Sequence, residues 1–532
     1  MNIGEVDYLV VGGGSAGSVL AARLSEDPGT RVGLLEAGGS GDSQLVKVPM
    51  GVVGMLPTKI NNYALETVPQ AGLNGRRGYQ PRGKGLGGSS AINAMVYVRG
   101  HRSDYDHWAA LGNSGWSYDD LLPYFLRSED NASLRNEHHG QGGPLHVTDL
   151  RTGNPFQKIY LEAGRQAGFK LNADFNGAEQ EGVGFYQVTQ QNGERWSAAR
   201  GYLHPHMGRR ANLQVGTGVQ VKRILFEGRR AIGVMCSQGG QEHTIKARKE
   251  ILLSAGAFHT PQLLMVSGVG PAEHLRQRGI QVVQALPGVG QNLQDHPDFI
   301  FGYAARSTDL MGISVGGSLR MTREILRYLR KREGMLTSNF AECGGFLKTD
   351  PALAAPDLQL HFVISLVEDH ARKLHLAHGY SCHFCLLRPK SRGQVTLASA
   401  DMRDPPLIDP AFLADERDLE DMVKGFKTTR RLMDAPALAS QRHKDLFTAD
   451  VKTDDDIRAV LRQRVDTVYH PVGSCKMGAD DMAVVDPQLR VRGMQGLRVI
   501  DASVMPTLIG GNTNAPTIAI AEKAVDMIRA AA

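Results

Sequence analysis

Residues 6–17 read VDYLVVGGGSAG, and this stretch decides the fold. The first half is typical of a short buried strand, and residues 12–17 fit the pattern G-x-G-x-x-G. Leu20 and Leu24 then follow at helical spacing, and a second apolar run, VGLL at 32–35, ends at Glu36. Strand, glycine turn, helix, strand and acid in this order predict a dinucleotide-binding unit.

The chemistry of this unit points to an adenine dinucleotide. Gly12, Gly14 and Gly17 let the backbone turn sharply and approach a pyrophosphate, and the helix that follows presents free N–H groups and its positive end. We expect Glu36 to accept hydrogen bonds from both ribose hydroxyls, where a 2′-phosphate would be repelled. The ligand is therefore FAD or NAD rather than NADP.

Residues 83–88, GKGLGG, also fit G-x-G-x-x-G, but YQPR at 79–82 is not a buried strand. We therefore reject this segment as a second dinucleotide fingerprint. The longer stretch 83–97 is nevertheless too rich in glycine for solvent turns alone. Small residues let backbone N–H groups press against a flat ring such as a flavin, which needs such contacts at its polar edge.

Length and composition exclude several classes of function. A chain of 532 residues predicts two or three domains, and 42% apolar with 22% charged residues is typical of a soluble globular protein.

The net charge of +5 is spread along the chain. The densest basic run, 320–332, predicts one solvated helix face rather than a nucleic-acid site. We find no apolar run long enough to span a membrane and no signal peptide, which predicts a cytoplasmic protein and leaves peripheral membrane contact open.

The five cysteines predict reduced thiols rather than disulfides or a metal site. Cys382 and Cys385 lie three apart in an apolar segment that reads as a strand, so their side chains should point to opposite faces. The histidines at 370, 375 and 378 lack convincing metal spacing. We therefore expect no bound metal.

The predicted fold class is α/β: a Rossmann-like domain interleaved with an α+β substrate domain built on an antiparallel sheet. Short strands with a hairpin are expected at 213–215, 220–225 and 231–234, and 250–256 reads as a buried strand that runs into small residues. The last 40 residues return to the small-residue style of the N-terminus, whereas 297–460 mixes alternating strands with helices such as 415–433. The expected cofactor domain comprises 1–155, 205–296 and 463–532, and the expected substrate domain comprises 156–204 and 297–462.

Four segments together resemble the glucose–methanol–choline flavoprotein oxidoreductases, namely 83–97, 256–270, 469–478 and 511–517. The resemblance covers essentially the whole chain, because the segments occur in the family's order. Within the family the chain is most similar to choline dehydrogenases and bacterial primary-alcohol dehydrogenases. It is less similar to oxidases of aryl-alcohol and hydroxymethylfurfural substrates.

The resemblance implies FAD as the cofactor. Some members bond the flavin covalently through a histidine directly before the residue that matches Asn93, and this chain has Ile92 there. A side chain without a nucleophile predicts non-covalent FAD. The cofactor-binding residues that we expect are Gly12, Gly14, Ser15, Ala16, Gly17, Glu36, Ala37, Gly87, Ser89, Asn93, Ala94, Met95, Val96, Val221, Asp501, Ala502 and Asn512.

The resemblance also implies a catalytic pair, His470 and Asn514. Alcohol oxidation needs a base for the hydroxyl proton, and imidazole suits that task near neutral pH. We expect Asn514 to donate a hydrogen bond to the substrate oxygen. Tyr469 and Glu342 are candidate substrate-binding residues; for Glu342, a structural carboxylate is the alternative to a partner for a quaternary ammonium group.

The sequence thus predicts FAD-dependent oxidation of a primary alcohol to an aldehyde, with proton abstraction at His470 and hydride transfer to flavin N5. Electrons would pass to a quinone-like acceptor or to oxygen, and no nucleic acid takes part. A lyase of the same fold that contains FAD is the alternative. We expect His296 and His259 to be structural.

Overall fold

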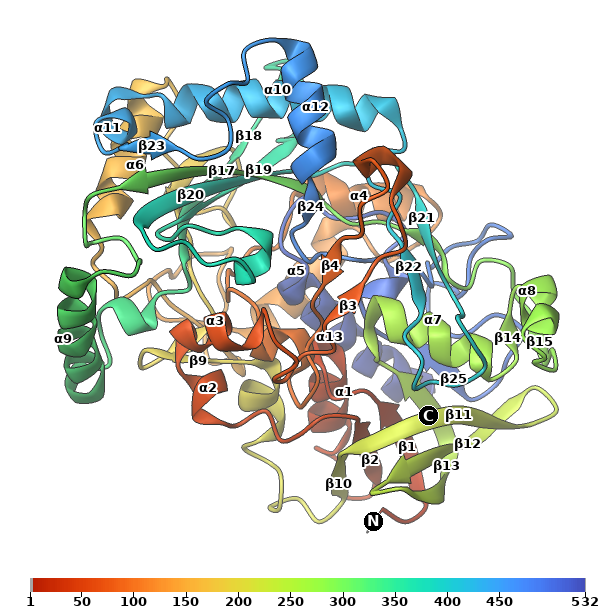
Figure 1. Ribbon diagram of the computed structural model, residues 1–532. Coiled ribbons are helices and arrows are strands. Elements are labelled where there is room, and N and C mark those ends of the chain that lie inside the picture. Colours follow the sequence, from red (N-terminus) through yellow and green to blue (C-terminus); the bar gives the residue numbers. More distant parts are fainter. Residues whose placement is uncertain (1–2, 532) are drawn as a thin grey trace.

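The computed structural model describes residues 3–531, which are organised around two large sheets (Figure 1). The first sheet has the strand order β10-β2-β1-β13-β12-β11, and β25 pairs with the free edge of β13. Strands β10, β2, β1, β13 and β25 run parallel, and the β11–β12 hairpin is antiparallel to the first half of β13. The bounds of these strands are β1 (Val6–Val11), β2 (Val32–Glu36), β10 (Leu213–Thr217), β11 (Val219–Glu227), β12 (Arg230–Gln238), β13 (Gln241–Leu253) and β25 (Leu497–Val499).

Helices from both ends of the chain pack together beside this sheet. Helix α1 (Ser15–Leu24) lies against α13 (Asn514–Ala531), and α13 lies against α5 (Tyr118–Ser128). The buried carboxylate of Glu522, on α13, accepts hydrogen bonds from Arg23 on α1 and from the hydroxyl of Tyr202. This ion pair joins segments that the sequence separates by almost its whole length.

The second sheet is antiparallel throughout, with the order β23-β17-β20-β19-β18-β7 and with β24 paired to β17. Helices α10 (Glu416–Met433), α11 (Pro436–Ala439) and α12 (Asp454–Arg464) lie along its outer side, at the top of Figure 1. Its strands are β7 (Gly182–Phe185), β17 (Pro297–Ala305), β18 (Ala341–Leu347), β19 (Leu358–Val363), β20 (His378–Leu386), β23 (Lys444–Asp445) and β24 (Asp466–Thr467).

Smaller elements connect the sheets. The remaining α-helices are α2 (Gln44–Lys47), α3 (Val52–Met55), α4 (Arg102–Ala110), α6 (Pro155–Gln166), α7 (Gly256–Val266), α8 (Ala272–Gln277) and α9 (Val315–Lys331). The remaining strands are β3 (Leu65–Glu66), β4 (Tyr79–Gln80), β5 (Glu129–Asn131), β6 (Leu145–Val147), β8 (Gln190–Gln191), β9 (Glu194–Arg195), β14 (Val269–Gly270), β15 (Gln284–Ala285), β16 (Gln291–Leu293), β21 (Gly393–Thr396) and β22 (Leu407–Asp409).

The architecture confirms the predicted fold class. Each sheet is assembled from segments that alternate along the chain, as expected for an interleaved α/β protein. The proposed domain limits remain a sequence-based division, and β24, inside the segment 463–532, pairs with the second sheet. The expectation of no buried strand at 79–82 is wrong in part, because Tyr79 and Gln80 form the short buried strand β4. Segment 83–88 itself forms turns and the start of a 3₁₀ helix rather than leading into an α-helix.

The cysteines and the basic run also have defined places. All five cysteines are free and buried, and Cys382 and Cys385 on β20 belong to two different apolar clusters. The basic run lies on α9, where Arg323, Arg327 and Arg330 are exposed. The prediction of a simple solvated face is incomplete, however, because leucines share the exposed surface of α9. No helix among residues 3–531 is both long and apolar enough to cross a membrane.

Candidate active site

A long cavity is lined by residues of both sheets. One end lies at the carboxyl edge of the first sheet, beside Gly12, Glu36 and Asp501. The other end is lined by residues of the second sheet, among them Ala341 on β18 and His361 on β19. The site therefore exists only where the two sheets meet.

The carboxyl edge of the first sheet is built to receive an anion. Strands β1, β13 and β25 end there, and helices α1, α7 and α13 begin there. The positive ends of helices and their free N–H groups are a favourable environment for a phosphate. Asp501 secures the edge, since its carboxylate accepts hydrogen bonds from Gly256 N at 2.9 Å, from Thr260 Oγ1 at 2.6 Å and from Ser503 N at 2.8 Å.

The turn between β1 and α1 leaves no room for side chains. A Cβ atom at Gly17 would lie 1.9 Å from the carbonyl oxygen of Gly12, and one at Gly12 would lie 2.5 Å from that of Ser254. Gly12 also has φ of +100°, a conformation that favours glycine. These contacts give the physical reason for two of the glycines in the fingerprint.

Glu36 joins the two glycine-rich segments. Its Oε2 accepts a hydrogen bond from Gly13 N at 2.8 Å, and its Oε1 accepts from Gly38 N at 2.8 Å and Gly85 N at 3.0 Å. Burial raises the pKa of this carboxyl, and the backbone N–H groups oppose that effect. Glu36 also lines the cavity, and each carboxylate oxygen can accept more than one hydrogen bond, so hydroxyl donors of a ligand can bond it as well.

The loop at 93–96 forms the middle of the cavity wall. Asn93 Oδ1 accepts hydrogen bonds from Met95 N at 3.0 Å and from Arg195 Nη1 at 2.9 Å. Met95 has φ of +59°, the left-handed region that non-glycine residues rarely adopt. Burial lowers the pKa of Arg195 to about 9. A strained loop held by a buried cation is typical of a functional site.

Most of the expected cofactor-binding residues line this cavity. Gly17 and Gly87 do not: Gly17 packs on Gly12, and Gly87 donates its N–H to Gly13 O at 2.7 Å. The expected residues that do line it are Gly12, Gly14, Ser15, Ala16, Glu36, Ala37, Ser89, Asn93, Ala94, Met95, Val96, Val221, Asp501, Ala502 and Asn512.

His470 lies in the wall at the other end of the cavity, buried and held by three polar groups. Its backbone N–H donates to Asp295 Oδ1 at 2.8 Å, and its Nδ1 lies 3.0 Å from Nδ1 of His296. Its Nε2 lies 3.1 Å from Nδ2 of Asn512. The amide of Asn512 is oriented in turn by Gln359, whose Nε2 donates to Asn512 Oδ1 at 2.8 Å.

This chain of contacts defines the protonation state of His470. Because Asn512 Oδ1 accepts from Gln359, its Nδ2 must donate to His470, so Nε2 of His470 carries a lone pair. The proton of the neutral ring then lies on Nδ1, facing His296. Burial, followed by the neighbouring His296 and His361, lowers the pKa of His470 well below 6.5, and burial lowers that of His296 to about 3.

The structure places Asn512, and not Asn514, in contact with the imidazole of His470. Asn514 also lines the cavity; it is the first residue of α13, and its Oδ1 accepts a hydrogen bond from Ser15 Oγ at 2.7 Å. The role that we expected for Asn514 toward the substrate oxygen stays a prediction. The two asparagines lie close in sequence but face different neighbours, because α13 begins between them.

Tyr469 and Glu342 also differ from each other in placement. Tyr469 lines the cavity, with φ of +76°, but its hydroxyl is 2.7 Å from Nδ1 of His370. Glu342 is not a lining residue. Its carboxylate accepts hydrogen bonds from Ser338 Oγ at 2.7 Å and Gln157 Nε2 at 2.9 Å, and burial raises its pKa to about 7. These contacts favour the alternative in which Glu342 is a structural carboxylate rather than a partner for a quaternary ammonium group.

The sequence did not reveal the environment of the imidazole. His296, which we expected to be merely structural, contacts His470 directly. Gln359 and His361 lie on β19, and no motif marks them. Their only signal is the apolar alternation of the strand, which predicts a buried face without identifying a site. No group of three or more His, Cys, Asp or Glu side chains among the described residues could hold a metal.

Comparison with known proteins places this geometry in a family. The N-terminal model of the GMC oxidoreductases matches residues 6–298, and their C-terminal model matches residues 389–521. The chain belongs to the GMC oxidoreductase family. It is an enzyme of the oxidoreductase class whose relatives act on CH–OH groups.

Individual relatives match over nearly the whole chain. An alcohol dehydrogenase (acceptor) of Pseudomonas putida is 47% identical, over 98% of this chain and 95% of its own length. The mitochondrial choline dehydrogenase of Homo sapiens is 44% identical, over 99% and 90%. The crystal structure of pyridoxine 4-oxidase from Mesorbium loti superposes with a TM-score of 0.89 at 32% identity, covering 99% of both chains.

Proposed function

We propose that this GMC oxidoreductase uses FAD to oxidise a primary alcohol to an aldehyde. The observation that carries the proposal is the imidazole of His470, whose Nε2 lone pair faces Asn512 in a cavity that continues to the carboxyl edge of the first sheet. The names of the relatives support oxidation of an alcohol and give no support to a lyase.

FAD fits the residues of the cavity. The turn before α1 and the N-termini of three helices suit its pyrophosphate, and Glu36 and Asp501 are carboxylates placed for hydroxyl groups. The loop 93–96 presents small side chains and backbone where a flat ring needs close contact. When bound, the flavin of FAD supplies the acceptor for the hydride that leaves the alcohol carbon.

The chain's own residues handle the proton. Because its pKa is low, His470 is neutral at neutral pH, and Nε2 can accept the hydroxyl proton of the alcohol. Asn512 Nδ2 can then donate to the substrate oxygen, because Gln359 keeps that amide from turning over. Such a base contributes roughly 10²–10⁴ in rate. We therefore propose Asn512, rather than Asn514, as the donor to the substrate oxygen, because only Asn512 contacts His470.

The wall beside His470 favours an apolar alcohol over choline. Phe340, Val363 and Leu366 line this end of the cavity, whereas the carboxylates that line the cavity, Glu36 and Asp501, lie at the opposite end. Asp295, which accepts the backbone N–H of His470, does not line the cavity, so a quaternary ammonium group would meet no lining carboxylate at this end. The apolar side chains would instead bind an aliphatic or aryl group. Higher kcat/KM for choline than for benzyl alcohol or octanol would contradict this substrate class.

We further propose that FAD is bound without a covalent bond and that a quinone-like compound, rather than oxygen, accepts the electrons. Ile92, the position before Asn93, lines the cavity but offers no nucleophile. The Pseudomonas putida relative, named for an acceptor, supports the second point, whereas several choline dehydrogenases that match this chain are named oxygen-dependent. Assays with a quinone or dye and, separately, for hydrogen peroxide distinguish the two acceptors.

The central test is anaerobic mixing with a primary alcohol. The flavin absorbance should bleach with the native protein, and His470→Asn should slow bleaching by roughly 10²–10⁴. Asn512→Ala should slow it more than Asn514→Ala does, because only Asn512 contacts the imidazole. His107→Asn, an exposed position, serves as the control. Equal bleaching by native protein and His470→Asn would refute the assigned base.

A further inference from the structure

Helix α9 stands apart at the edge of the molecule, on the left of Figure 1. Its inner face attaches it to the second sheet's domain. Tyr328 is buried, Met321 packs on the apolar core, Arg320 pairs with Asp309, and Glu324 accepts a hydrogen bond from Met335 N at 2.7 Å. None of these contacts involves the opposite face of the helix.

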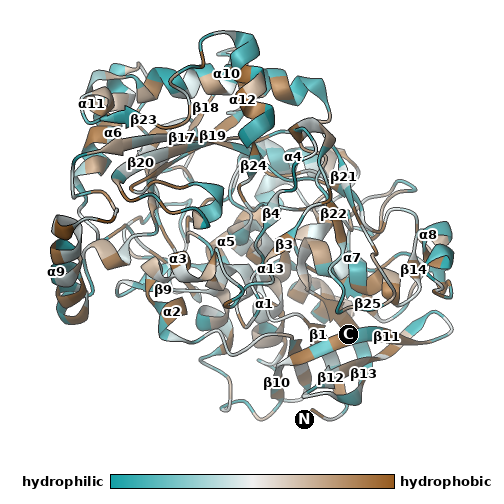
Figure 2. Cartoon of the chain, in the orientation of Figure 1, coloured by the Kyte–Doolittle hydropathy of each residue, from teal (hydrophilic) through white to brown (hydrophobic). Residues whose placement is uncertain are grey.

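That opposite face is apolar rather than polar. Val315, Leu319, Leu326 and Leu329 recur at helical spacing and form what we call the α9 outer face. Their exposed fractions are 82%, 65%, 48% and 64%. Hydrophobic colouring is visible on α9 in Figure 2. A water-exposed apolar stripe of this kind marks a surface for a partner.

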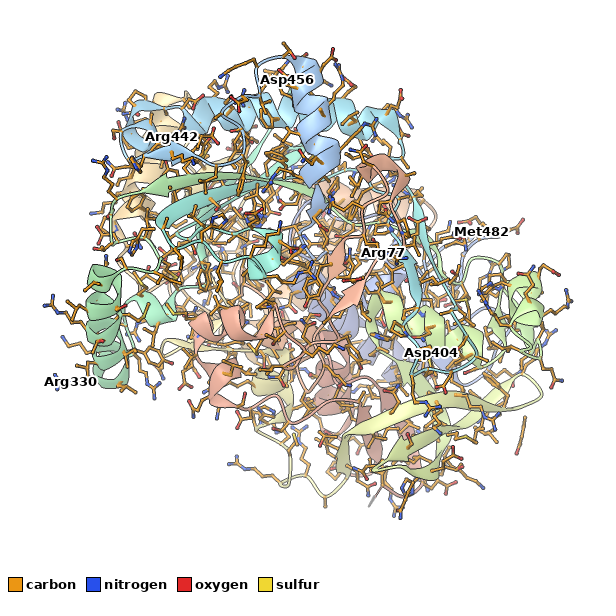
Figure 3. All side chains as sticks on the ribbon, in the orientation of Figure 1. Arg77, Arg330, Asp404, Arg442, Asp456 and Met482 are labelled. Carbon is orange, nitrogen blue, oxygen red and sulfur yellow. The ribbon has the colours of Figure 1, made fainter. Side chains whose placement is uncertain are left out.

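Free cations flank the α9 outer face. Arg320 and Arg327 pair with Asp309 and Glu333, but Arg323, Arg330 and Lys331 form no ion pair within residues 3–531. Arg330 extends away from the body of the molecule (Figure 3). The only acid within α9 is Glu324, which faces inward to Met335. The partner must therefore be both apolar and anionic.

A neighbouring loop extends the apolar surface. Leu374 and Leu376 are 78% and 79% exposed. The loop that carries them reaches the start of α9, where Ser314 Oγ lies 2.7 Å from Nε2 of His378. A helix and a loop that present leucines beside unpaired arginines match the structure of interfacial anchors.

We propose that α9 docks this protein on an anionic phospholipid surface. The leucines of the α9 outer face would enter the boundary between headgroups and acyl chains, and Arg323, Arg330 and Lys331 would lie at the level of the phosphates. The loop that carries Leu374 begins with residues Ser365, Leu366 and Val367, which line the substrate cavity. Docking would therefore bring to the membrane a loop that also contributes to the cavity wall. The inference does not depend on the proposed reaction.

The test is co-sedimentation of the FAD-loaded full chain with phosphatidylcholine vesicles, with and without phosphatidylglycerol. We expect binding to the anionic vesicles and binding weaker by about 100-fold to the neutral ones, since each basic residue near such a surface contributes about fivefold. The triple variant Arg323→Gln, Arg330→Gln, Lys331→Gln should lose this preference for anionic lipid.

A second set of variants tests the apolar contribution. Leu319→Asn, Leu326→Asn and Leu329→Asn combined should weaken binding by about 100-fold or more, because each leucine buries most of a side chain. The control is Leu111→Asn with Met482→Asn, two exposed residues elsewhere on the surface; Figure 3 labels Met482 on the side opposite Arg330. The circular dichroism spectrum and the dye-coupled activity without vesicles should stay native in all variants.

Three results would overturn the proposal. Native protein that stays in the supernatant with anionic vesicles would do so, and so would leucine variants that sediment as well as the control. A native dimer that the leucine variants convert to a monomer would show that a second copy of the chain covers the α9 outer face instead.

Discussion

At the scale of single residues, the chemistry of the site is set by burial. His470 is an ordinary imidazole whose neutral form is favoured because it is taken out of water beside two other histidines. Asp295 accepts a hydrogen bond from the backbone N–H of His470, and burial raises the pKa of the Asp295 carboxyl to about 6. Neither property belongs to the residue type; both follow from what the fold places around it.

The low pKa of His470 predicts the pH dependence of the reaction. The active form is the unprotonated base, which persists below pH 6.5 because the pKa is lowered from that value. We expect kcat/KM to stay level as the pH falls from alkaline values to 6.5 and to decrease only at lower pH. The rate of anaerobic flavin reduction across a pH series measures this dependence. A decrease with a midpoint above pH 6.5 would argue against a buried, neutral His470.

Glu342 predicts a pH-dependent difference in stability. Its carboxyl is neutral in the folded chain up to a pKa of about 7 but ionises near 4.5 once unfolded, so its contribution is complete below 4.5 and is lost as the pH rises to 7. Glu342→Gln cannot ionise and can keep both hydrogen bonds. Its free energy of unfolding relative to the native chain should rise by about 1.4 kcal/mol per pH unit over this window.

Urea unfolding of both proteins at a series of pH values measures this difference. The same pair of proteins tests the alternative role of Glu342, the binding of a quaternary ammonium group. We expect equal KM for choline in the two proteins; a large increase in Glu342→Gln would restore that role.

At the scale of elements, the ends of strands and helices make the site. Strands β1, β13 and β25 end, and helices α1, α7 and α13 begin, at one edge of the first sheet. The register of these few elements thus brings together residues from both termini and the middle of the chain. The Ser15–Asn514 hydrogen bond connects the first turns of α1 and α13 directly.

The glycine turn predicts a severe effect of one methyl group. Gly17→Ala would place Cβ 1.9 Å from Gly12 O, so α1 would have to move away from β1. We expect destabilisation of at least about 2 kcal/mol and loss of bound flavin. Gly39→Ala is the control, because a Cβ there meets nothing within 4 Å. Flavin absorbance and the Tm of the purified proteins measure the effect; a Gly17→Ala protein that retains flavin would contradict it.

At the scale of the whole molecule, the cavity is a joint product of both sheets. The first sheet supplies the anion-binding edge, and the second supplies Phe340, His361 and the other walls around His470. Because the segments interleave, neither half of the site can form from one continuous part of the chain.

This shared cavity predicts that FAD stabilises the whole molecule reversibly. With Ile92 in place of a nucleophile, denaturation followed by filtration should release all flavin into the filtrate. Titrating FAD into the stripped protein should then raise Tm, by an amount equivalent to about 2.7 kcal/mol at a hundred times Kd. Flavin that stays on the denatured chain, or a Tm that does not respond, would exclude dissociable FAD.

The local motifs could be predicted from the sequence for a physical reason. The turn at 12–17, the acid at Glu36 and the family segments are defined by neighbours in sequence, where steric demands and hydrogen bonds act over a few residues. The interleaved α/β class followed from the same local patterns and was confirmed. Contacts between strands from different sheets, such as Gln359 with Asn512, follow no short-range rule, and the sequence did not predict them.

The amino-acid sequence by itself therefore determined the dinucleotide-type fold, the family and the imidazole at 470. Only the tertiary structure decided that Asn512 rather than Asn514 contacts that imidazole, that the carboxylate of Glu342 bonds Ser338 and Gln157, and that α9 exposes leucines. The reason is that side-chain neighbours, burial and the shifted pKa of His470 depend on long-range packing, which brings together residues far apart in the chain.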